Sequence, residues 1–132
     1  MITAPIFVPL ARDGRVLWKQ RVRTPYNTAA LTTAGGLAFV GDWDRNVYAY
    51  DVQTGKEVWK VTRKSDARDE SMEAYTSPVI WRKGKEEYLV TLGADYAIAH
   101  RLDNGAEIWR LGGLNPKDSY NDALRLIASP VA

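Results

Sequence analysis

The chain has 132 residues, about the length of one ordinary domain, and its 45% hydrophobic and 26% charged residues are a globular composition. Five Trp and seven Tyr favour sheets over a helical bundle. The net charge of +2 gives no support for nucleic acid binding. The lack of cysteine excludes disulfides, thiolate zinc sites and cysteine nucleophiles within this chain.

The N-terminal stretch MITAPIFVPLARDG has no basic start followed by an apolar run of about 7–15 residues, so it does not predict a secretory signal. No window reaches the roughly 18 apolar residues that a membrane span requires. We therefore expect no membrane span, and either a cytoplasmic protein or an export signal that lies outside this sequence.

A segment that ends in tryptophan occurs three times along the chain. The copies are IFVPLARDGRVLW (6–18), VYAYDVQTGKEVW (47–59) and AIAHRLDNGAEIW (97–109). In each copy a glycine precedes the tryptophan by four positions, and the tryptophans are 41 and 50 residues apart. A period of roughly 40–50 residues indicates a stacked or radial repeat protein.

Each period contains four short apolar runs separated by turn residues, which predicts four strands. The expected strands are 29–33, 37–41, 46–51 and 56–62, and then 76–81, 87–93, 96–102 and 106–111. A four-stranded antiparallel sheet per repeat of this length is a β-propeller blade. Helix is expected to be negligible, with a turn near 121–126 as its main exception.

The glycine of each repeat is expected in a left-handed turn between the third and fourth strands. Asn104-Gly105 predicts a two-residue hairpin in which both residues have positive φ. Residues 41–51 align with residues 93–103 at an offset of 52. This alignment predicts that the turn is two residues shorter in the later repeat than in the earlier one. The tryptophans are predicted to cover the contact between neighbouring blades rather than to stack on a cofactor.

The stretch 32–60 closely resembles the blade repeat of quinoprotein-type, or PQQ-like, β-propellers, in which Ala-x-Asp-x-x-Thr-Gly-Lys-x-x-Trp recurs around typically seven or eight blades. The matching residues are Ala49, Asp51, Thr54, Gly55, Lys56 and Trp59. The copy that ends at Trp109 keeps Asp103 and Gly105, and the copy that ends at Trp18 has Leu10 in place of the acid.

The predicted fold is therefore all-β, with about two complete blades and parts of two flanking ones. The expected units are a blade part at 1–24, blades at 25–63 and 74–111, and the start of a further blade at 126–132. Two blades cannot close a ring, and their outer faces would be apolar. We expect a segment of a longer propeller, whose partners are the remaining blades or another chain.

Propeller topology places the loops between second and third strands, and the links between blades, on one rim of the ring. The two long links are larger than a simple connection requires, and such loops often carry binding sites. The candidate binding patch on this rim consists of Asp42, Trp43, Asp44, Arg45, Arg63, Arg68, Tyr75, Asp95, Tyr96, Asn115, Tyr120 and Arg125.

Each candidate has a structural alternative. Asp42 and Asp44 could ligate calcium, but two acids without further ligands are more often turn residues, so no metal site is predicted. Trp43 either packs on a neighbouring loop or contacts a ligand or protein. His100, the single histidine, is predicted to be an internally hydrogen-bonded strand residue. No set of catalytic residues is predicted.

The residues favour a non-catalytic propeller segment that acts as a binding or assembly scaffold, with a possible protein partner and no cofactor in this segment. The resemblance also implies an alternative: a fragment of a pyrroloquinoline-quinone-dependent alcohol or sugar dehydrogenase, with quinone and calcium in the full-length protein. The sequence leaves enzymatic activity open. Members of the family are usually exported, so the resemblance implies a periplasmic location.

Overall fold

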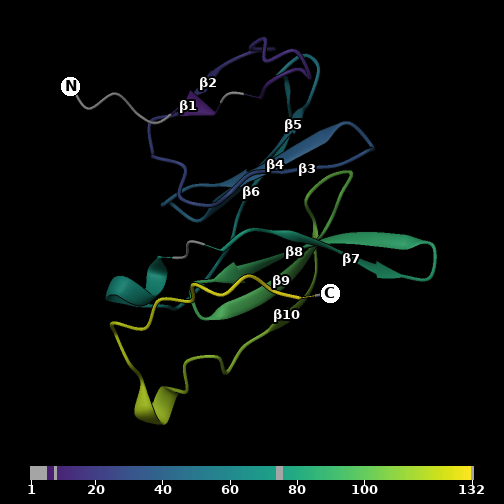
Figure 1. The fold of residues 1–132 in the computed structure, drawn as a ribbon. Coiled ribbons are helices and arrows are strands. Elements are labelled where there is room, and N and C mark those ends of the chain that lie inside the picture. The colour runs from purple at the N-terminus through teal and green to yellow at the C-terminus, as the bar shows by residue number, and fades with distance from the viewer. Residues whose placement is uncertain (1–5, 8, 74–75, 132) are drawn as a thin grey trace.

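The computed structural model describes residues 6–7, 9–73 and 76–131 (Figure 1). Within these residues the chain forms ten strands and two 3-10 turns of three or four residues. The strands are β1 (Ile6–Phe7), β2 (Gln20–Arg21), β3 (Leu31–Thr32), β4 (Leu37–Gly41), β5 (Asn46–Asp51), β6 (Glu57–Thr62), β7 (Val79–Lys83), β8 (Glu86–Gly93), β9 (Tyr96–Arg101) and β10 (Glu107–Leu111). The 3-10 turns are η1 (Asp69–Met72) and η2 (Lys117–Ser119).

The strands form two four-stranded antiparallel sheets, in the orders β3-β4-β5-β6 and β7-β8-β9-β10. The two sheets follow one another along the chain as separate units, and the short β1–β2 pair precedes them (Figure 1). The all-β blade architecture predicted from the repeat is confirmed. The 3-10 turns lie in the two links, at 69–72 and 117–119, and the expected turn within 121–126 is present as a single hydrogen-bonded turn, in which the N–H of Leu124 donates to the carbonyl of Asn121 at 3.1 Å.

The first strand of each sheet is shorter than its apolar run predicts. β3 spans two residues because the hydroxyl of Thr28 accepts the backbone N–H of Gly41 at 2.8 Å, which replaces a backbone carbonyl in the pairing with β4. On the N-terminal side of Thr28 the pairing resumes, because Tyr26 and Asp42 form an isolated antiparallel β-bridge. The segment before β3 therefore follows β4 without a continuous ladder.

Both faces of the first sheet are buried, as its continuous apolar strands predict. One face contributes to a cluster that extends into the second sheet through β8: Phe39, Val47, Ala49, Trp59 and Leu89. The opposite face packs against the preceding part of the chain: Val40, Tyr48 and Tyr50 against Trp18, Val22 and Tyr26. The first sheet is thus enclosed on both sides, as expected of an internal blade.

We call the contact between two successive blades a seam, and each seam contains the repeated glycine and tryptophan. At the first seam, the indole Nε1 of Trp18 donates to the carbonyl of Val52 at 2.7 Å, and a Cβ at Gly55 would lie 2.5 Å from the same indole ring. At the second seam, Trp59 donates to a carbonyl at 2.7 Å and covers Gly105. Both glycines have φ above +70°, so each position requires glycine twice over.

The turn after β9 differs from its prediction. Gly105 has positive φ but Asn104 does not, and Arg101 pairs with Ala106 across a four-residue turn. The backbone N–H of Arg101 donates to the carbonyl of Ala106, and that of Gly105 donates to the carbonyl of Arg101. The same two hydrogen bonds, between residues 50 positions earlier, close the turn after β5. The two-residue turn with both φ angles positive instead joins β8 to β9, at 94–95.

This geometry also corrects the alignment of the repeats. At an offset of 50, Asp51 aligns with Arg101 and Gln53 aligns with Asp103. The carboxylate of Asp51 accepts the N–H of Thr54 at 2.8 Å, whereas Arg101 forms an ion pair with Asp103 at 2.9 Å. The two-residue shortening therefore lies in the loop between second and third strands, which has four residues at 42–45 and two at 94–95.

Candidate functional site

The predicted rim is formed as one continuous region of the structure. The backbone N–H of Arg63 donates to the carbonyl of Arg45 at 2.8 Å, so the first link begins against the loop 42–45. The second link meets the first where Ser71 donates to the carbonyl of Asp122 at 3.1 Å. The short loops and the long links thus lie at the same end of the two blades.

Asp42 lies beneath the rim surface, with only 4% of it exposed. Its carboxylate accepts the backbone N–H and the side-chain amide of Asn46, both at 2.9 Å, and the hydroxyl of Tyr48 at 2.8 Å. Burial, together with this bond to Asp42, raises the pKa of Tyr48 far above its ordinary value, so the phenol stays a neutral donor. Asp42 therefore holds the loop together.

The other three residues of this loop differ in exposure. Trp43 is 51% exposed and presents its ring to solvent. Asp44 is exposed and accepts the hydroxyl of Thr24. Arg45 is half-buried with φ of 64°, and its guanidinium donates to the carbonyl of Ser65 at 3.3 Å. Of these residues, Trp43 offers the largest apolar surface for contact with another molecule.

In the second blade, Asp95 is the buried acid of the corresponding loop. Its carboxylate accepts the amide of Asn115 at 3.2 Å and the hydroxyl of Tyr120, both from the following link. Asn115 also donates to Ser71 at 3.2 Å and to the carbonyl of Asn121 at 3.0 Å. One buried amide therefore joins the loop and both links.

Beside this network lies a hollow of about 300 Å³. Most of the residues that line it have polar side chains, and they come from both links, from the loop 94–95 and from the start of β9: Asp66, Arg68, Asp95, Tyr96, Gly113, Asn115, Lys117 and Tyr120. Five residues of the predicted patch are among them. Asp66 and Lys117 were missed, although both lie in the long links on which that prediction concentrated.

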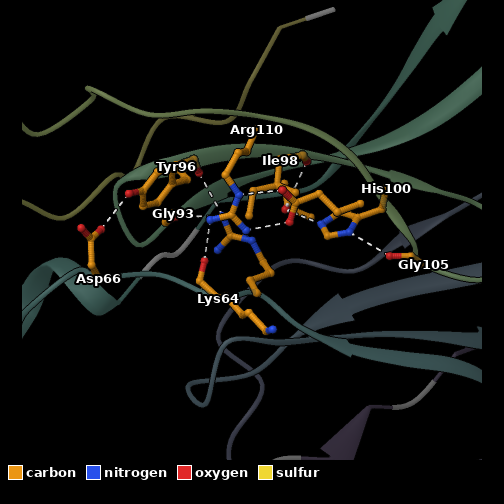
Figure 2. Close-up of polar contacts among 11 residues, drawn as sticks. Lys64, Asp66, Gly93, Tyr96, Ile98, His100, Gly105 and Arg110 are labelled. Atoms are coloured by element: carbon orange, nitrogen blue, oxygen red, sulfur yellow. Dashed lines mark hydrogen bonds and ion pairs between the residues drawn. The ribbon is translucent and has the colours of Figure 1, made fainter.

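Asp66 connects the two sides of the hollow. Its carboxylate accepts Lys117 Nζ at 2.6 Å and the hydroxyl of Tyr96 at 2.7 Å, and the second contact is visible in Figure 2. These bonds, that of Lys117 first, lower the pKa of Asp66 to about 2. The charges that line the hollow, two acids and two bases, are thus balanced, as befits a zwitterionic or neutral polar ligand.

The remaining cations of the predicted patch are engaged within the chain. Arg68 lies over the ring of Tyr120, 4.4 Å from its centroid, and forms an ion pair with Asp122 at 3.4 Å. Arg125 lies apart from the hollow and pairs with Glu70 and Glu73 at 3.2 and 3.4 Å. Tyr75 lies outside the described residues.

Arg63 is a buried part of the seam rather than an exposed member of the patch. Its Nη2 donates to the carbonyls of Gly93 and Tyr96, at 2.8 and 2.9 Å. Because these carbonyls flank the loop 94–95, Arg63 fixes the start of the first link to the rim of the second blade. A ligand on the rim surface would meet Tyr96 before it met Arg63.

His100 lies inside the second sheet, as predicted. Nδ1 is 3.1 Å from the carbonyl of Gly105 and Nε2 is 3.2 Å from the hydroxyl of Thr91, and Figure 2 shows the ring directed at Gly105. Burial, which outweighs the bond to Gly105, lowers the pKa of His100 to about 4. The imidazole is therefore neutral at physiological pH and lies away from the hollow.

Among residues 6–7, 9–73 and 76–131, no group of three or more His, Asp or Glu side chains is arranged to hold a metal ion. Asp42, one of the two acids considered for calcium, has its oxygens occupied by protein donors. The two 3-10 turns in this described part are also far too short to cross a membrane.

Comparison with known proteins places this arrangement in a family. The model of the PQQ_2 family, described as outer membrane protein assembly factor BamB, matches residues 7–131. The chain belongs to the PQQ-like β-propeller family. Among solved structures, BamB from Moraxella catarrhalis superimposes with a TM-score of 0.61 and 17% identity, over 85% of this chain and 31% of that one.

Quinoprotein dehydrogenases of this PQQ-like family are similar as well. A quinoprotein ethanol dehydrogenase from Pseudomonas aeruginosa is 34% identical over 87 residues, which are 65% of this chain and 13% of that protein. The structure of the quinohemoprotein alcohol dehydrogenase ADHIIG from Pseudomonas putida HK5 has a TM-score of 0.61 and 24% identity, over 83% of this chain and 18% of that one. The chain thus spans only about an eighth of the curated dehydrogenases that it matches.

The rim of this PQQ-like segment does not by itself fit pyrroloquinoline quinone, a planar ring system with three carboxylates. Such an anion needs cations free to meet it, but Arg68 and Arg125 are bound to carboxylate groups of the chain. The hollow also contains the carboxylates of Asp66 and Asp95, which would repel it. The described residues therefore form no complete quinone site.

Proposed function

We propose that this chain forms blades of the propeller of a quinoprotein alcohol dehydrogenase. The observation that carries the proposal is the 34% identity to the Pseudomonas aeruginosa ethanol dehydrogenase. A second relative, the alcohol dehydrogenase PedE from Pseudomonas putida, supports it with 31% identity over 86 residues. The alternative implied by the family resemblance is therefore preferred to the scaffold that the residues alone favoured.

Within such an enzyme, this segment contributes walls and rim rather than a cofactor site. Its seams are closed by Trp18 and Trp59, and the rim cations Arg68 and Arg125 form ion pairs inside the chain. The quinone and its calcium ion would be held mainly by residues outside this sequence. The hollow beside Asp66 and the exposed ring of Trp43 are the surfaces available to a substrate or a partner.

The test is reconstitution of the full-length protein with pyrroloquinoline quinone and calcium, followed by dye-linked oxidation of ethanol and 1-butanol. The expected result is a change in the quinone absorption spectrum and alcohol-dependent reduction of the dye, both abolished when a chelator removes calcium. Absence of both signals, in a sample whose circular dichroism shows folded sheet, would overturn the dehydrogenase proposal.

The second candidate is an assembly scaffold, favoured by the description of the matching family model and by the superposition on BamB. A rim in which Trp43 is exposed is suited to a protein partner. Deletion of the gene would then lower the amounts of folded outer membrane proteins, which deletion of a dehydrogenase would leave unchanged. Under either function we expect a periplasmic location, which cell fractionation tests.

A further inference from the structure

The seam between the two blades contains a buried cation whose hydrogen bonds are incomplete. Arg63 is 7% exposed, and its Nε is the one buried side-chain nitrogen or oxygen of the described residues that has no hydrogen-bond partner. Its Nη2 group is satisfied by two carbonyls, which are neutral. An unmatched donor on a buried charge is costly, so a species absent from the polypeptide is expected beside it.

A small cavity of about 40 Å³ lies at this place, with Arg63 in its wall. The first blade provides one side, which includes Asp42, Arg45 and Asn46, and the second blade provides the other, which includes Thr76 and Thr91. Such a space holds one or a few small species, since a water needs roughly 10–15 Å³ by the same measure. The cavity therefore lies between the two blades and is partly open to solvent, with polar groups on both sides and apolar side chains over most of its lining.

The charges in the wall of the cavity do not cancel. Arg45 and Arg63 carry two positive charges, and neither belongs to an ion pair of the described residues. The single carboxylate in the wall, that of Asp42, accepts three protein donors. One unit of positive charge thus remains uncompensated in a wall where Arg63 is buried and Arg45 is half-buried.

The surroundings of Arg63 support this account. Burial first, and then the neighbouring cations Arg110 and Arg45, lower the pKa of Arg63 to about 10. The nearby acid Glu107 is already paired with Arg110 at 2.6 Å. A guanidinium remains charged at neutral pH even with this shift, so the seam must accommodate its charge.

We propose that the cavity binds one small monovalent anion of halide size, which accepts the Arg63 Nε–H and neutralises the seam between the blades. A water molecule would satisfy the same donor but would leave the positive charge. An anion such as gluconate is too large for the space. The site is independent of the proposed dehydrogenase activity, because it rests on the seam and not on the quinone.

The direct test is crystallography of the full-length protein grown or soaked in sodium bromide. Bromide scatters anomalously, so the expected result is an anomalous peak in the cavity within hydrogen-bond distance of Arg63 Nε. A well-ordered water at this position and no anomalous peak would overturn the proposal.

The solution test compares the melting temperature in sodium chloride and in sodium gluconate at equal ionic strength. Binding of chloride at about ten times its Kd is expected to raise the melting temperature by about 3 °C over gluconate. Arg63→Lys keeps the charge but loses the Nε–H, and should abolish this difference. Arg82→Lys changes an exposed arginine paired with Glu87, and should retain it.

A second variant keeps the proposal testable if Arg63→Lys fails to fold. Arg45→Asn removes the other cation from the cavity wall, and asparagine tolerates the positive φ of this position. Its chloride-dependent rise should fall below half of the wild-type value. An equal rise in Arg45→Asn and in the wild type, or none in the wild type, would contradict an anion site.

Discussion

The two blades are alike at one end and different at the other. At the turn between third and fourth strands, Gly55 and Gly105 have nearly the same φ and both lie under a tryptophan of the preceding blade. At the rim, the buried acid Asp42 is satisfied within its own blade, whereas Asp95 is satisfied by the link that follows. The contact between glycine and tryptophan is repeated from blade to blade, and the contacts at the rim differ.

The difference teaches where specificity in this chain can reside. A turn that touches the adjacent indole tolerates few sequences, because its glycine has no room for a side chain. The two rim loops differ in length, and their polar groups have different partners. Binding by this segment should therefore depend on the rim, and stability on the turns.

The largest effect is expected from Gly105→Ala. The added Cβ would lie 2.7 Å from the Trp59 ring and 2.8 Å from Val61, at a φ of +74°. Left-handed strain and overpacking together should lower the free energy of unfolding by about 3 to 4 kcal/mol, measured by urea denaturation.

Gly84→Ala is the matched control for that substitution. Its φ is also positive, at +63°, but nothing lies within 4 Å of the added Cβ, so a loss of only about 1 kcal/mol is expected. Equal losses at Gly84 and Gly105 would show that contact with the tryptophan does not restrict the turn.

The second effect is a pH dependence confined to one blade. His100 occupies the place that Tyr50 holds in the first sheet, 50 positions earlier. Its pKa is about 4 when folded against an ordinary value near 6.5, so between these values the unfolded state binds more protons. Stability is therefore full above pH 6.5 and falls as the pH drops toward 4, by up to about 3 kcal/mol.

Equilibrium denaturation at pH 7.5 and pH 4.5, with His100→Gln as the comparison, measures this dependence. Glutamine can keep bonds to the Thr91 hydroxyl and the Gly105 carbonyl but cannot be protonated, so the acid-induced loss should shrink in the variant. An unchanged loss would place the titrating group elsewhere.

A smaller effect distinguishes the rim loop of the second blade from that of the first. Asn115→Ala removes the amide that joins Asp95 to both links, and should cost about 2 kcal/mol. It should also release the link 112–125, so that trypsin cleaves after Lys117 at lower enzyme concentrations than in the wild type.

Asn46→Ala is the corresponding change in the first blade, where the amide serves Asp42 of the same loop. A similar loss of stability is expected, without faster cleavage after Lys117. Faster cleavage in both variants would mean that the link is released by general destabilisation rather than by loss of its own anchor.

The smallest effect on stability is expected from Trp43→Ala. Because half of this side chain is exposed, the free energy of unfolding should change by no more than about 0.5 kcal/mol. The melting temperature should therefore stay close to that of the wild type. If the rim binds a substrate or a partner, KM or the dissociation constant should rise at least threefold. Unchanged binding would remove Trp43 from the candidate site.

The sequence predicted the strands well because each depends on local patterns. β4 and β5 match their expected ranges at both ends, since turn residues bound these apolar runs. The turn at Gly105 was misjudged because Asn104-Gly105 is a strong hairpin signal on its own. The contact with Trp59, a residue 46 positions earlier, decides its geometry, and local reasoning does not include it.

The candidate site was predictable in position but not in detail. The long links predicted that Tyr96, Asn115 and Tyr120 lie at one end of the blades, and they do meet there, while their role in binding stays a prediction. Which side chains are buried depends on contacts between the links, so the sequence could not show that Asp42 and Arg63 lie beneath the surface. The role of Asp66 depends on Lys117, 51 residues later, and has no local signature.

The contact between tryptophan and glycine at each seam has a consequence for how such proteins evolve. Both seams use an equivalent tryptophan ring, carbonyl and glycine. Each blade therefore provides the glycine for contact with the preceding blade and the tryptophan for contact with the following one. A duplicated blade would arrive with a ready-made interface on each side, as in other repeat proteins. The number of blades can therefore grow or shrink by gene duplication and loss without the invention of a new contact.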